Sequence, residues 1–300
     1  MSKTGKNPAR VGAGRAGGFF SSLYDNVLHS EILWPLAKCL IKNLRLFSYS
    51  LRARMGLLSK KPEYARCVFA GAFLGKSLGL KRISVIEFGV AGGRGLTALE
   101  RHAEKIGREM GIEIEVYGFD SGHGLPKSVD YRDLPYIWSE GFYKMDYEKL
   151  RKRLHGAKII LGDVKETVND FFKTYKPAPV AAVMFDMDLY SSTAPALRLF
   201  EADYEHLLPR IFTYFDDIGS SIFDYNACFS EYSGERLAIN EFNAAHSDRK
   251  ISPDFGLLAE KFRESWYTRI FIVHIFNHTK YNELIVDKEI DHSAQLSLPG

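Results

Sequence analysis

The stretch Arg82-Ile-Ser-Val-Ile-Glu-Phe-Gly-Val-Ala-Gly-Gly-Arg-Gly-Leu96 decides how this chain folds. Its first half is mainly apolar, its second half holds four glycines, and residues 96–101 continue with apolar side chains at helical spacing. This pattern predicts a buried strand, a tight loop and a helix. Glycines let a backbone approach a ligand closely, and the helix that follows offers unpaired N–H groups. We therefore predict a nucleotide-binding α/β unit with a carboxylate, Glu87, near the end of its strand.

Two cofactor patterns overlap in this loop. Residues 93–98 fit the G-x-G-x-x-G/A pattern of dinucleotide sites, while Glu87, Gly89, Gly92 and Gly93 fit the acid-x-Gly-x-x-x-Gly signature of sites for S-adenosylmethionine (SAM). A dinucleotide site holds pyrophosphate on these glycines, and Glu87 would repel it. SAM carries an ammonium and a sulfonium group, so the acid favours SAM, bound by the four residues of the second pattern. The alternatives are a nicotinamide cofactor and a tight turn without a ligand.

The composition is that of a folded globular protein. Of 300 residues, 46% are hydrophobic and 26% charged, which is ample for a core. The three cysteines, Cys39, Cys67 and Cys228, are odd in number and far apart. A disulfide framework or cysteine zinc site is therefore not expected, and a cytoplasmic location is. No apolar run approaches the roughly 18 residues that a membrane span needs.

The ends of the chain are expected to differ from the rest. Residues 1–18 are Gly-rich and free of acids, which predicts a disordered basic tail. Of the 40 Lys and Arg residues, four lie in this tail and 36 remain against 37 Asp and Glu, so no nucleic-acid-binding face is expected. Residues 19–80 are predicted to form a helical region, whose first helix, 19–46, packs on its own domain or on the second subunit of a homodimer. Residues 287–300 are predicted to be a second tail.

Strand and helix patterns alternate along the remaining residues, 81–286. The predicted strands are 83–88, 113–120, 157–163, 180–188, 210–217 and 265–276, and the predicted helices are 63–78, 96–110, 164–175, 193–207 and 233–245. Such alternation is typical of a parallel sheet with helices on both faces. The fold class is therefore α/β, a Rossmann-like, doubly wound and mainly parallel sheet that closes with an antiparallel strand.

Each of the first five predicted strands ends in carboxylates. They are Glu87, Asp120, Asp163, Asp186 with Asp188, and Asp216 with Asp217. Ligands of open α/β sheets lie outside the carboxyl ends of the strands, so these acids share one rim. A single Asp after a strand is often a helix cap, but clustered carboxylates repel one another and need cations. We expect Asp120 to accept the ribose hydroxyls of an adenosine, and Asp163 either to meet the adenine amino group or to cap a helix.

The segment from residue 121 to 154 is long for a connection in a compact fold. It contains Tyr131, Tyr136, Trp138, Phe142 and Tyr143. Long connections are often lids, so these rings could shield a reaction from water or belong to a packed surface excursion. His123 in this segment is either an ordinary histidine of a surface loop or a proton carrier.

Four segments carry a family resemblance: residues 87–90 (EFGV), 118–126 (GFDSGHGLP), 185–193 (FDMDLYSST) and 214–217 (YFDD). Together they resemble the class I SAM-dependent methyltransferases of the macrocin O-methyltransferase type, over roughly half of the chain. The resemblance implies methyl transfer from SAM to a hydroxyl of a small molecule, a sugar or another diol or phenol. It implies Asp188, Asp216 and Asp217 as ligands of a divalent metal such as Mg²⁺, and it places Ser121 and Asp186 beside the cofactor.

The chemistry of these acids agrees with the resemblance. Hard cations such as Mg²⁺ prefer carboxylate oxygens and keep open positions, where two oxygens of a diol can bind and lose a proton more easily. Asp188 is the candidate general base, although a carboxylate bound to a metal is a poor base. Two rival functions remain: a nicotinamide-dependent oxidoreductase that uses Gly93, Gly95 and Ala98, and a SAM-fold binding protein without catalysis.

Overall fold

The computed structural model describes residues 36, 40, 47–219, 228–260 and 264–285. The predicted tails lie outside the described residues, and so does the helix predicted over 19–46, apart from Leu36 and Leu40, which are helical. The chain divides into two compact units, 1–47 and 48–300, and the second unit contains the sheet. The helices α3 (Tyr49–Arg54) and α4 (Pro62–Ser77), which come before the sheet in sequence, belong to this second unit.

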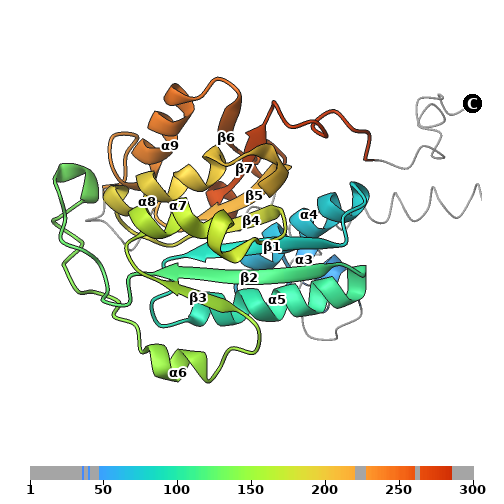
Figure 1. Cartoon of the computed structure of the whole chain (residues 1–300), viewed down its shortest axis with the longest axis horizontal. Helices are drawn as coiled ribbons and strands as arrows, with labels where there is room; N and C mark the ends of the chain where they lie inside the picture. The colour runs from blue at the N-terminus through green and yellow to red at the C-terminus, as the bar shows by residue number, and fades with distance from the viewer. Residues whose placement is uncertain (1–35, 37–39, 41–46, 220–227, 261–263, 286–300) are drawn as a thin grey trace, which may run out of the picture. The chain divides into compact units, whose positions relative to one another are not determined.

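Seven strands form one mixed sheet in the order β3-β2-β1-β4-β5-β7-β6 (Figure 1). The strands are β1 (Arg82–Phe88), β2 (Glu113–Asp120), β3 (Lys158–Leu161), β4 (Val180–Phe185), β5 (Leu207–Phe215), β6 (Arg249–Pro253) and β7 (Ile270–Ile275). The first five run parallel, and β7 pairs antiparallel with both β5 and β6. This mainly parallel sheet with antiparallel closing strands confirms the expected α/β fold. From β1 the chain builds the sheet outward through β2 and β3 on one side and through β4 and β5 on the other. Ligands of such sheets bind between β1 and β4, where the strand order changes direction.

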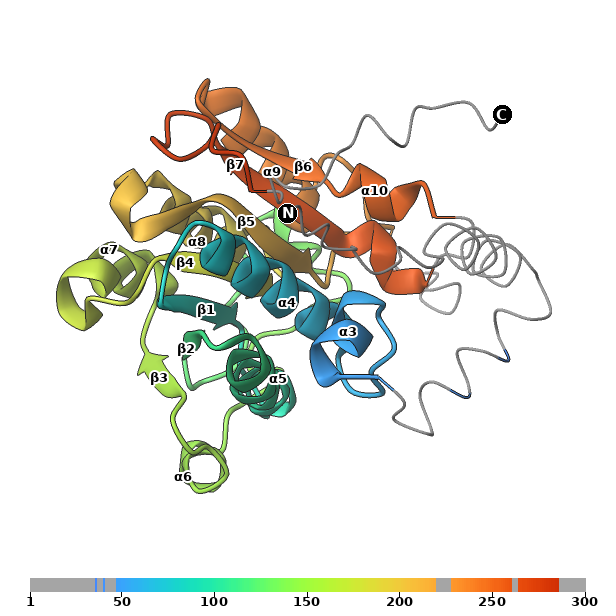
Figure 2. The same cartoon turned by 90° about the vertical axis from the view of Figure 1, so that its right-hand side faces the viewer.

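Helices cover both faces of the sheet (Figure 2). On one face lie α4 and α5 (Arg94–Met110), and on the other α7 (Val164–Tyr175), α8 (Tyr190–Ala196) and α9 (Gly234–Ala245). Shorter helices occur in the connections: η1 (Tyr131–Asp133), α6 (Tyr147–Arg151), η2 (Leu197–Glu201), η3 (Tyr204–His206), α10 (Phe255–Leu258) and η4 (Ser265–Arg269). With both faces covered, the central strand β4 is buried along its whole length.

A row of phenylalanines crosses the carboxyl ends of the parallel strands. Phe88 is in register with Phe119 on β2 and with Phe185 on β4, and Phe185 is in register with Phe215 on β5. All four rings are buried, and those of Phe185 and Phe215 stack with their centroids 4.5 Å apart. The residue after three of these rings is an aspartate, so the packed row brings the acids of neighbouring strands to one level at the rim.

Two predicted elements differ from the structure. The helix expected over 193–207 is α8, which begins earlier, contains Pro195 and passes into η2, because proline removes a backbone donor and disturbs a helix interior. The strand β6 was not predicted; it is short and lies at the edge of the sheet. The start of the strand expected at 265 is the 3₁₀ helix η4, and pairing begins at Ile270.

Within the described part of the chain, no helix combines the length and the apolar character needed to cross a bilayer.

Candidate active site

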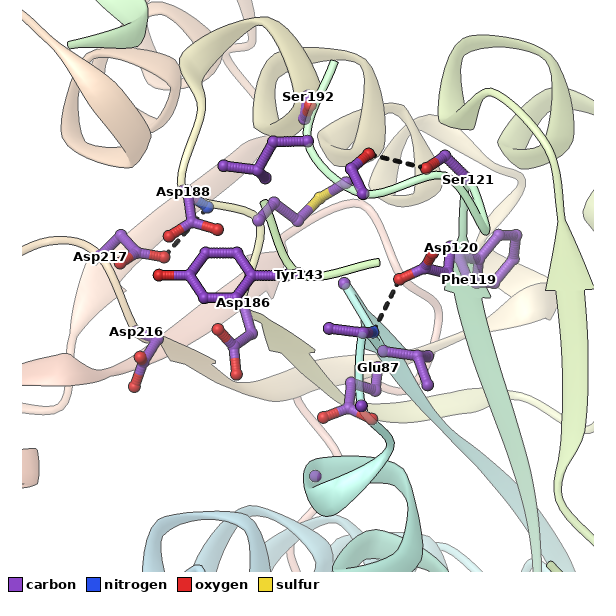
Figure 3. A pocket seen from close by; sticks show the side chains of 18 of the residues that line it. Glu87, Phe119, Asp120, Ser121, Tyr143, Asp186, Asp188, Ser192, Asp216 and Asp217 are labelled. Atoms are coloured by element: carbon purple, nitrogen blue, oxygen red, sulfur yellow. Dashed lines mark hydrogen bonds between the residues drawn. The ribbon is translucent and has the colours of Figure 1, made fainter. Parts of the chain in front are cut away.

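A cavity of about 1010 Å³ opens at the carboxyl ends of the parallel strands (Figure 3). Eleven residues were predicted for cofactor, metal and catalysis, and nine of them line it: Glu87, Gly89, Gly92, Asp120, Ser121, Asp186, Asp188, Asp216 and Asp217. The other two, Gly93 and Asp163, do not. Asp163 caps α7 by accepting a hydrogen bond from the backbone N–H of Lys165 at 2.9 Å. Of the two roles predicted for Asp163, the structure shows the helix cap.

Glu87 is almost fully buried in the wall of this cavity. Its Oε1 accepts a hydrogen bond from the hydroxyl of Tyr64 at 2.8 Å, and its Oε2 has no partner among the described residues. Burial, and then the negative charge of Asp186, raise the pKa of Glu87 well above its usual value. A buried carboxyl with one unused oxygen fits a cationic ligand group, which would return its pKa to a lower value.

The glycines of the loop make room for this carboxyl and for the packing of the helix. A Cβ on Gly95 would lie 1.7 Å from Oε1 of Glu87. Gly93 has φ 76°, and a Cβ there would lie 2.2 Å from Leu150. These two glycines of the dinucleotide pattern are therefore required by packing, without any pyrophosphate.

Replacing Gly95 by alanine is expected to lower the free energy of unfolding by about 1–3 kcal/mol, the range for overpacking a filled site. Gly92→Ala is the matched control, because a Cβ at Gly92 meets nothing within 4 Å. Urea unfolding of the two variants and the parent measures the difference. Equal midpoints for Gly95→Ala and the parent would show that Glu87 moves aside without cost.

Asp120 ties the loop after β1 to the loop after β2. Its Oδ2 accepts the backbone N–H of Ala91 at 2.8 Å, and its Oδ1 accepts that of Gly122 at 2.6 Å. Each carboxylate oxygen has a second lone pair, so both can still accept a ligand hydroxyl. The next residue, Ser121, donates its hydroxyl to the carbonyl of Gly124 at 2.9 Å. Contacts within the protein thus hold Asp120 and Ser121 at the edge of the cavity.

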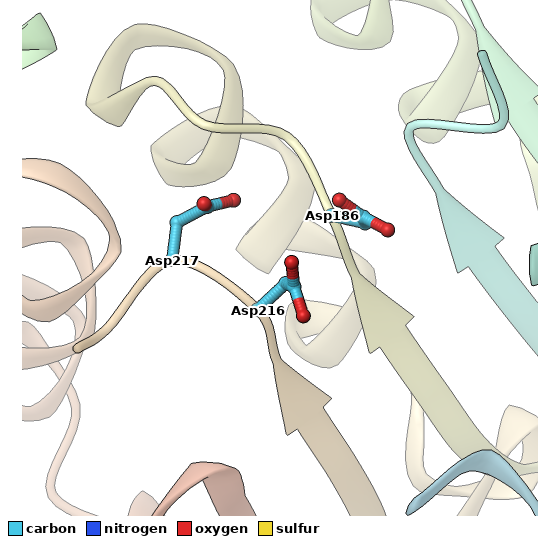
Figure 4. A group of neighbouring side chains, drawn as sticks. All are labelled: Asp186, Asp216 and Asp217. Carbon is cyan, nitrogen blue, oxygen red and sulfur yellow. The ribbon is translucent and has the colours of Figure 1, made fainter. Parts of the chain in front are cut away.

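Three aspartates form a compact acidic group where β4 and β5 end (Figure 4). Asp186, Asp216 and Asp217 each offer a carboxylate oxygen, and these oxygens all lie within 4.8 Å of one another. This group contains Asp186 in place of the expected Asp188. The backbone of Asp188 has φ 62°, and its N–H donates to Oδ2 of Asp217 at 3.0 Å. Asp188 therefore lies beside the acidic group and lines the cavity as a separate carboxyl.

Burial is the largest cause of the high pKa values in this region. It acts together with Asp216 to raise the pKa of Asp186 to about 6, and together with Asp186 to raise that of Asp188 to about 7. Burial and the charge of Asp188 raise the pKa of Asp217 well above its usual range. A bound cation would favour the charged forms of these carboxyls and lower their pKa values.

Two cations that the sequence analysis did not identify offset part of this negative charge. Arg269, at the end of η4, donates to Oδ1 of Asp216 at 3.1 Å and to the carbonyl of Gly219 at 2.9 Å. Lys61, just before α4, places its Nζ 3.7 Å from Oδ2 of Asp186. The repulsion among the acids required such cations, but these two residues are distant in sequence from the acids and carry no motif.

The turn after β5 is held from behind by the start of α9. Glu235 is fully buried and accepts the backbone N–H of Asp217 at 2.9 Å, and the neighbouring Arg236 donates to the carbonyl of Ile218 at 2.6 Å. These contacts hold the backbone that carries the Asp217 side chain. Glu235 could not be predicted from the sequence, since a glutamate in the first turn of a helix is common.

Part of the long segment between β2 and β3 forms a wall of the cavity. Trp138 and Tyr143 line it, with ring centroids 6.3 Å apart. The segment is folded back on itself, because the backbone of Leu125 bonds to those of Gly141 and Phe142 at 2.8 Å. The remaining candidates of this segment, Tyr131, Tyr136, Phe142 and His123, are exposed and do not line the cavity.

Comparisons with known proteins complete the description of the site. No protein-family model and no curated protein matches the chain. Among solved structures, it is similar to the calicheamicin methyltransferase CalS11 (18% identity, 91% of this chain and 99% of that chain covered, TM-score 0.46). It is also similar to the O-methyltransferase NovP (16%, 86% and 98%, TM-score 0.46) and to the O-methyltransferase TomG from Streptomyces achromogenes (15%, 87% and 96%, TM-score 0.41). Similarity at this level assigns no activity, so the function must be inferred from the residues of the site.

Proposed function

We propose that this protein is a SAM-dependent O-methyltransferase that methylates a hydroxyl of a small molecule with the help of a divalent metal. The observation that carries the proposal is a single cavity whose wall contains two separate carboxyl sites, each suited to bind a cation. Near β1 a buried carboxyl, Glu87, has an oxygen without a partner in the described part of the chain. Near β4 and β5 a group of three aspartates has negative charge that Lys61 and Arg269 offset only in part. SAM supplies a cation for the first, and a metal supplies one for the second.

Binding of SAM would use the loops that follow β1 and β2. Glu87 faces the ammonium of the amino-acid part, and Asp120 accepts the two ribose hydroxyls with its free lone pairs. Gly89, with φ 85°, lets the β1 loop approach that of β4, since a Cβ there would lie 1.8 Å from the carbonyl oxygen of Asp186. Together these residues would hold the cofactor along the rim, with its adenosine end at β2.

A divalent metal fits the donor set of the acidic group. Asp186, Asp216 and Asp217 offer only carboxylate oxygens, the ligands that Mg²⁺ prefers, and their spacing within 4.8 Å allows one ion to contact all three. When bound, the metal would act as a Lewis acid that lowers the pKa of the acceptor hydroxyl. Arg269 and Glu235 hold two of these aspartates in place through the contacts described above.

Asp188 is then available as the base. The acceptor oxygen forms a bond with the sulfonium methyl carbon, the carbon–sulfur bond breaks, and its electron pair leaves sulfur neutral in S-adenosylhomocysteine. The hydroxyl proton passes to the carboxylate of Asp188, which lines the cavity outside the acidic group. This division of labour removes the conflict between ligand and base, since different carboxylates perform the two tasks.

The two rival functions have less support. The oxidoreductase needs Gly93 and Gly95 at a pyrophosphate, but both are explained by packing against Leu150 and Glu87. A binding protein without catalysis has no use for the acidic group, in which burial and neighbouring carboxylates raise the pKa values of Asp186 and Asp217.

Asp120→Ala is expected to weaken SAM binding by about 1–3 kcal/mol, the cost of leaving hydrogen bonds of this kind unmade. The alanine also releases the loop at Ala91, so S-adenosylhomocysteine and adenosine should lose affinity together. Isothermal titration of both ligands checks this. Unchanged affinity for both ligands would show that Asp120 only connects the two loops and does not bind the cofactor.

Transfer of labelled methyl from SAM to a panel of sugars, other diols and phenols tests the activity. We expect a product with at least one acceptor class when Mg²⁺ is present, and strong loss of product in a chelator. Labelled product that forms equally well in the chelator would reject the role of the metal.

A further inference from the structure

Lys61 lies on a strained turn that directs its side chain into the cavity. Its backbone has φ 43° and ψ 58°, a left-handed conformation that costs a non-glycine residue about 1–3 kcal/mol. The turn is held by the buried His102 of α5, whose Nε2 lies 3.0 Å from the carbonyl oxygen of Lys60 and whose Nδ1 lies 2.7 Å from the hydroxyl of Tyr49. Contacts from α3 and α5 thus maintain a conformation that the local sequence does not favour.

The ammonium group of Lys61 retains capacity to bind a ligand. Its nearest carboxylate oxygens among the described residues are Oδ2 of Asp186 at 3.7 Å and Oε1 of Glu63 at 3.9 Å. Both distances exceed the roughly 2.7–3.2 Å of an N–H···O hydrogen bond. The ammonium also lies 4.7 Å from the centroid of the Tyr64 ring, an arrangement that stabilises its charge. Because the group has three N–H donors, it can turn toward an anionic partner in the cavity.

Lys61 and Glu87 are neighbours across one tyrosine. The hydroxyl of Tyr64 donates to Glu87, and the ring of the same residue faces Lys61. Burial and Asp186 raise the pKa of Glu87, and Lys61 is the cation that chiefly opposes this rise. Arg269, another cation at the cavity, is already bonded to Asp216 and Gly219. Lys61 and Glu87 therefore present an ammonium and a carboxyl side by side on the wall near β1.

We propose that Lys61 binds the carboxylate of the amino-acid part of SAM while Glu87 binds its ammonium. An α-amino acid carries both groups on one carbon, so its recognition requires adjacent charges of opposite sign, which Lys61 and Glu87 provide. This inference rests on the proposed function and adds to it the residue that selects a ligand with an intact amino acid. It also explains the strained turn, because a relaxed backbone at this position would direct the side chain elsewhere.

Isothermal titration of S-adenosylhomocysteine and of methylthioadenosine, which lacks the amino acid, tests the role of Lys61. For Lys61→Met we expect the affinity for S-adenosylhomocysteine to fall at least about tenfold, as for the loss of a charge-assisted hydrogen bond. Affinity for methylthioadenosine should stay within about twofold, which also shows that the cavity is intact. Lys61→Arg keeps the charge and should restore most of the difference. Lys60→Met is the matched control, since the exposed neighbour loses the same charge outside the cavity.

Each other outcome is decisive. An unchanged affinity of Lys61→Met for S-adenosylhomocysteine would overturn the inference and leave the proposed function intact. An equal loss for both ligands would also overturn it, because Lys61 would then shape the cavity as a whole. If the parent protein binds neither ligand, the proposed function fails, and the inference fails with it.

Discussion

Asp188→Asn is expected to reduce kcat by about 10²–10⁴-fold, the usual contribution of a general base. Asparagine has the same size and keeps the backbone N–H that bonds to Asp217, but its amide cannot take up the hydroxyl proton. Affinity for S-adenosylhomocysteine should remain within about threefold of the parent, because the base we propose would contact the acceptor and not the cofactor. Steady-state kinetics with a responsive acceptor, together with titration of the product cofactor, separate the two effects.

Asp203→Asn is a suitable control for the loss of one carboxylate, because Asp203 is exposed, and its side chain makes no capping bond to η3. It should leave kcat unchanged. A kcat for Asp188→Asn within threefold of the parent would assign the proton to another acceptor, such as solvent.

Asp217→Asn is expected to have the largest effect on metal binding. The amide oxygen can still accept the N–H of Asp188, but the acidic group loses one negative charge. We expect Mg²⁺ affinity to fall by at least the roughly 10–100-fold seen for residues that merely support a ligand. Turnover should then require correspondingly more Mg²⁺, with little change in affinity for S-adenosylhomocysteine. Calorimetric titration with Mg²⁺ alone provides the direct measurement.

The thermal stability of the same variant is a useful second measurement. Burial and neighbouring acids raise the pKa of Asp217 in the protein without metal. Removing this charge relieves repulsion, so the melting temperature of the metal-free Asp217→Asn variant should not fall. Equal Mg²⁺ affinity in the variant and the parent would contradict the assignment of Asp217 as a ligand.

The sequence predicted the sheet and most of the rim because both follow from local patterns. Runs of apolar residues that end in an acid mark β1, β2, β4 and β5, and parallel strands bring their carboxyl ends together. The aspartates at these ends could therefore be assigned to one site from the sequence alone. Which three of them group most closely depended on the left-handed backbone of Asp188, and aspartate is common at such positions without any marker in the sequence.

The residues that escaped prediction come from outside the strand ends. Lys61 and Arg269 reach the cavity from a turn before α4 and from η4, and Glu235 of α9 supports the backbone of Asp217 from behind. The clustered acids imply that cations are present, but only tertiary packing determines which lysine or arginine supplies them. Asp163 shows the opposite case: a residue with a suitable position in the sequence caps a helix and does not itself line the cavity.

The segment before the sheet has a larger part in the site than its helical pattern indicated. The residues just before α4 provide Lys61, and the first turns of α4 provide Tyr64, which bonds to Glu87. The same helix packs against β4 and β5, so the position of these side chains is coupled to the central strands. Removing residues 1–61, which include Lys61, is therefore expected to weaken cofactor binding.

The most direct measurement for the central claim is calorimetric titration of the metal-stripped protein with SAM, and separately with NAD⁺ and NADH, each repeated with Mg²⁺. We predict saturable binding of SAM in the micromolar range and no binding of either nicotinamide cofactor. Saturable binding of NAD⁺ or NADH, with none of SAM, would contradict the account: the glycines after β1 would then hold a pyrophosphate, and methyl transfer at this site would have to be abandoned.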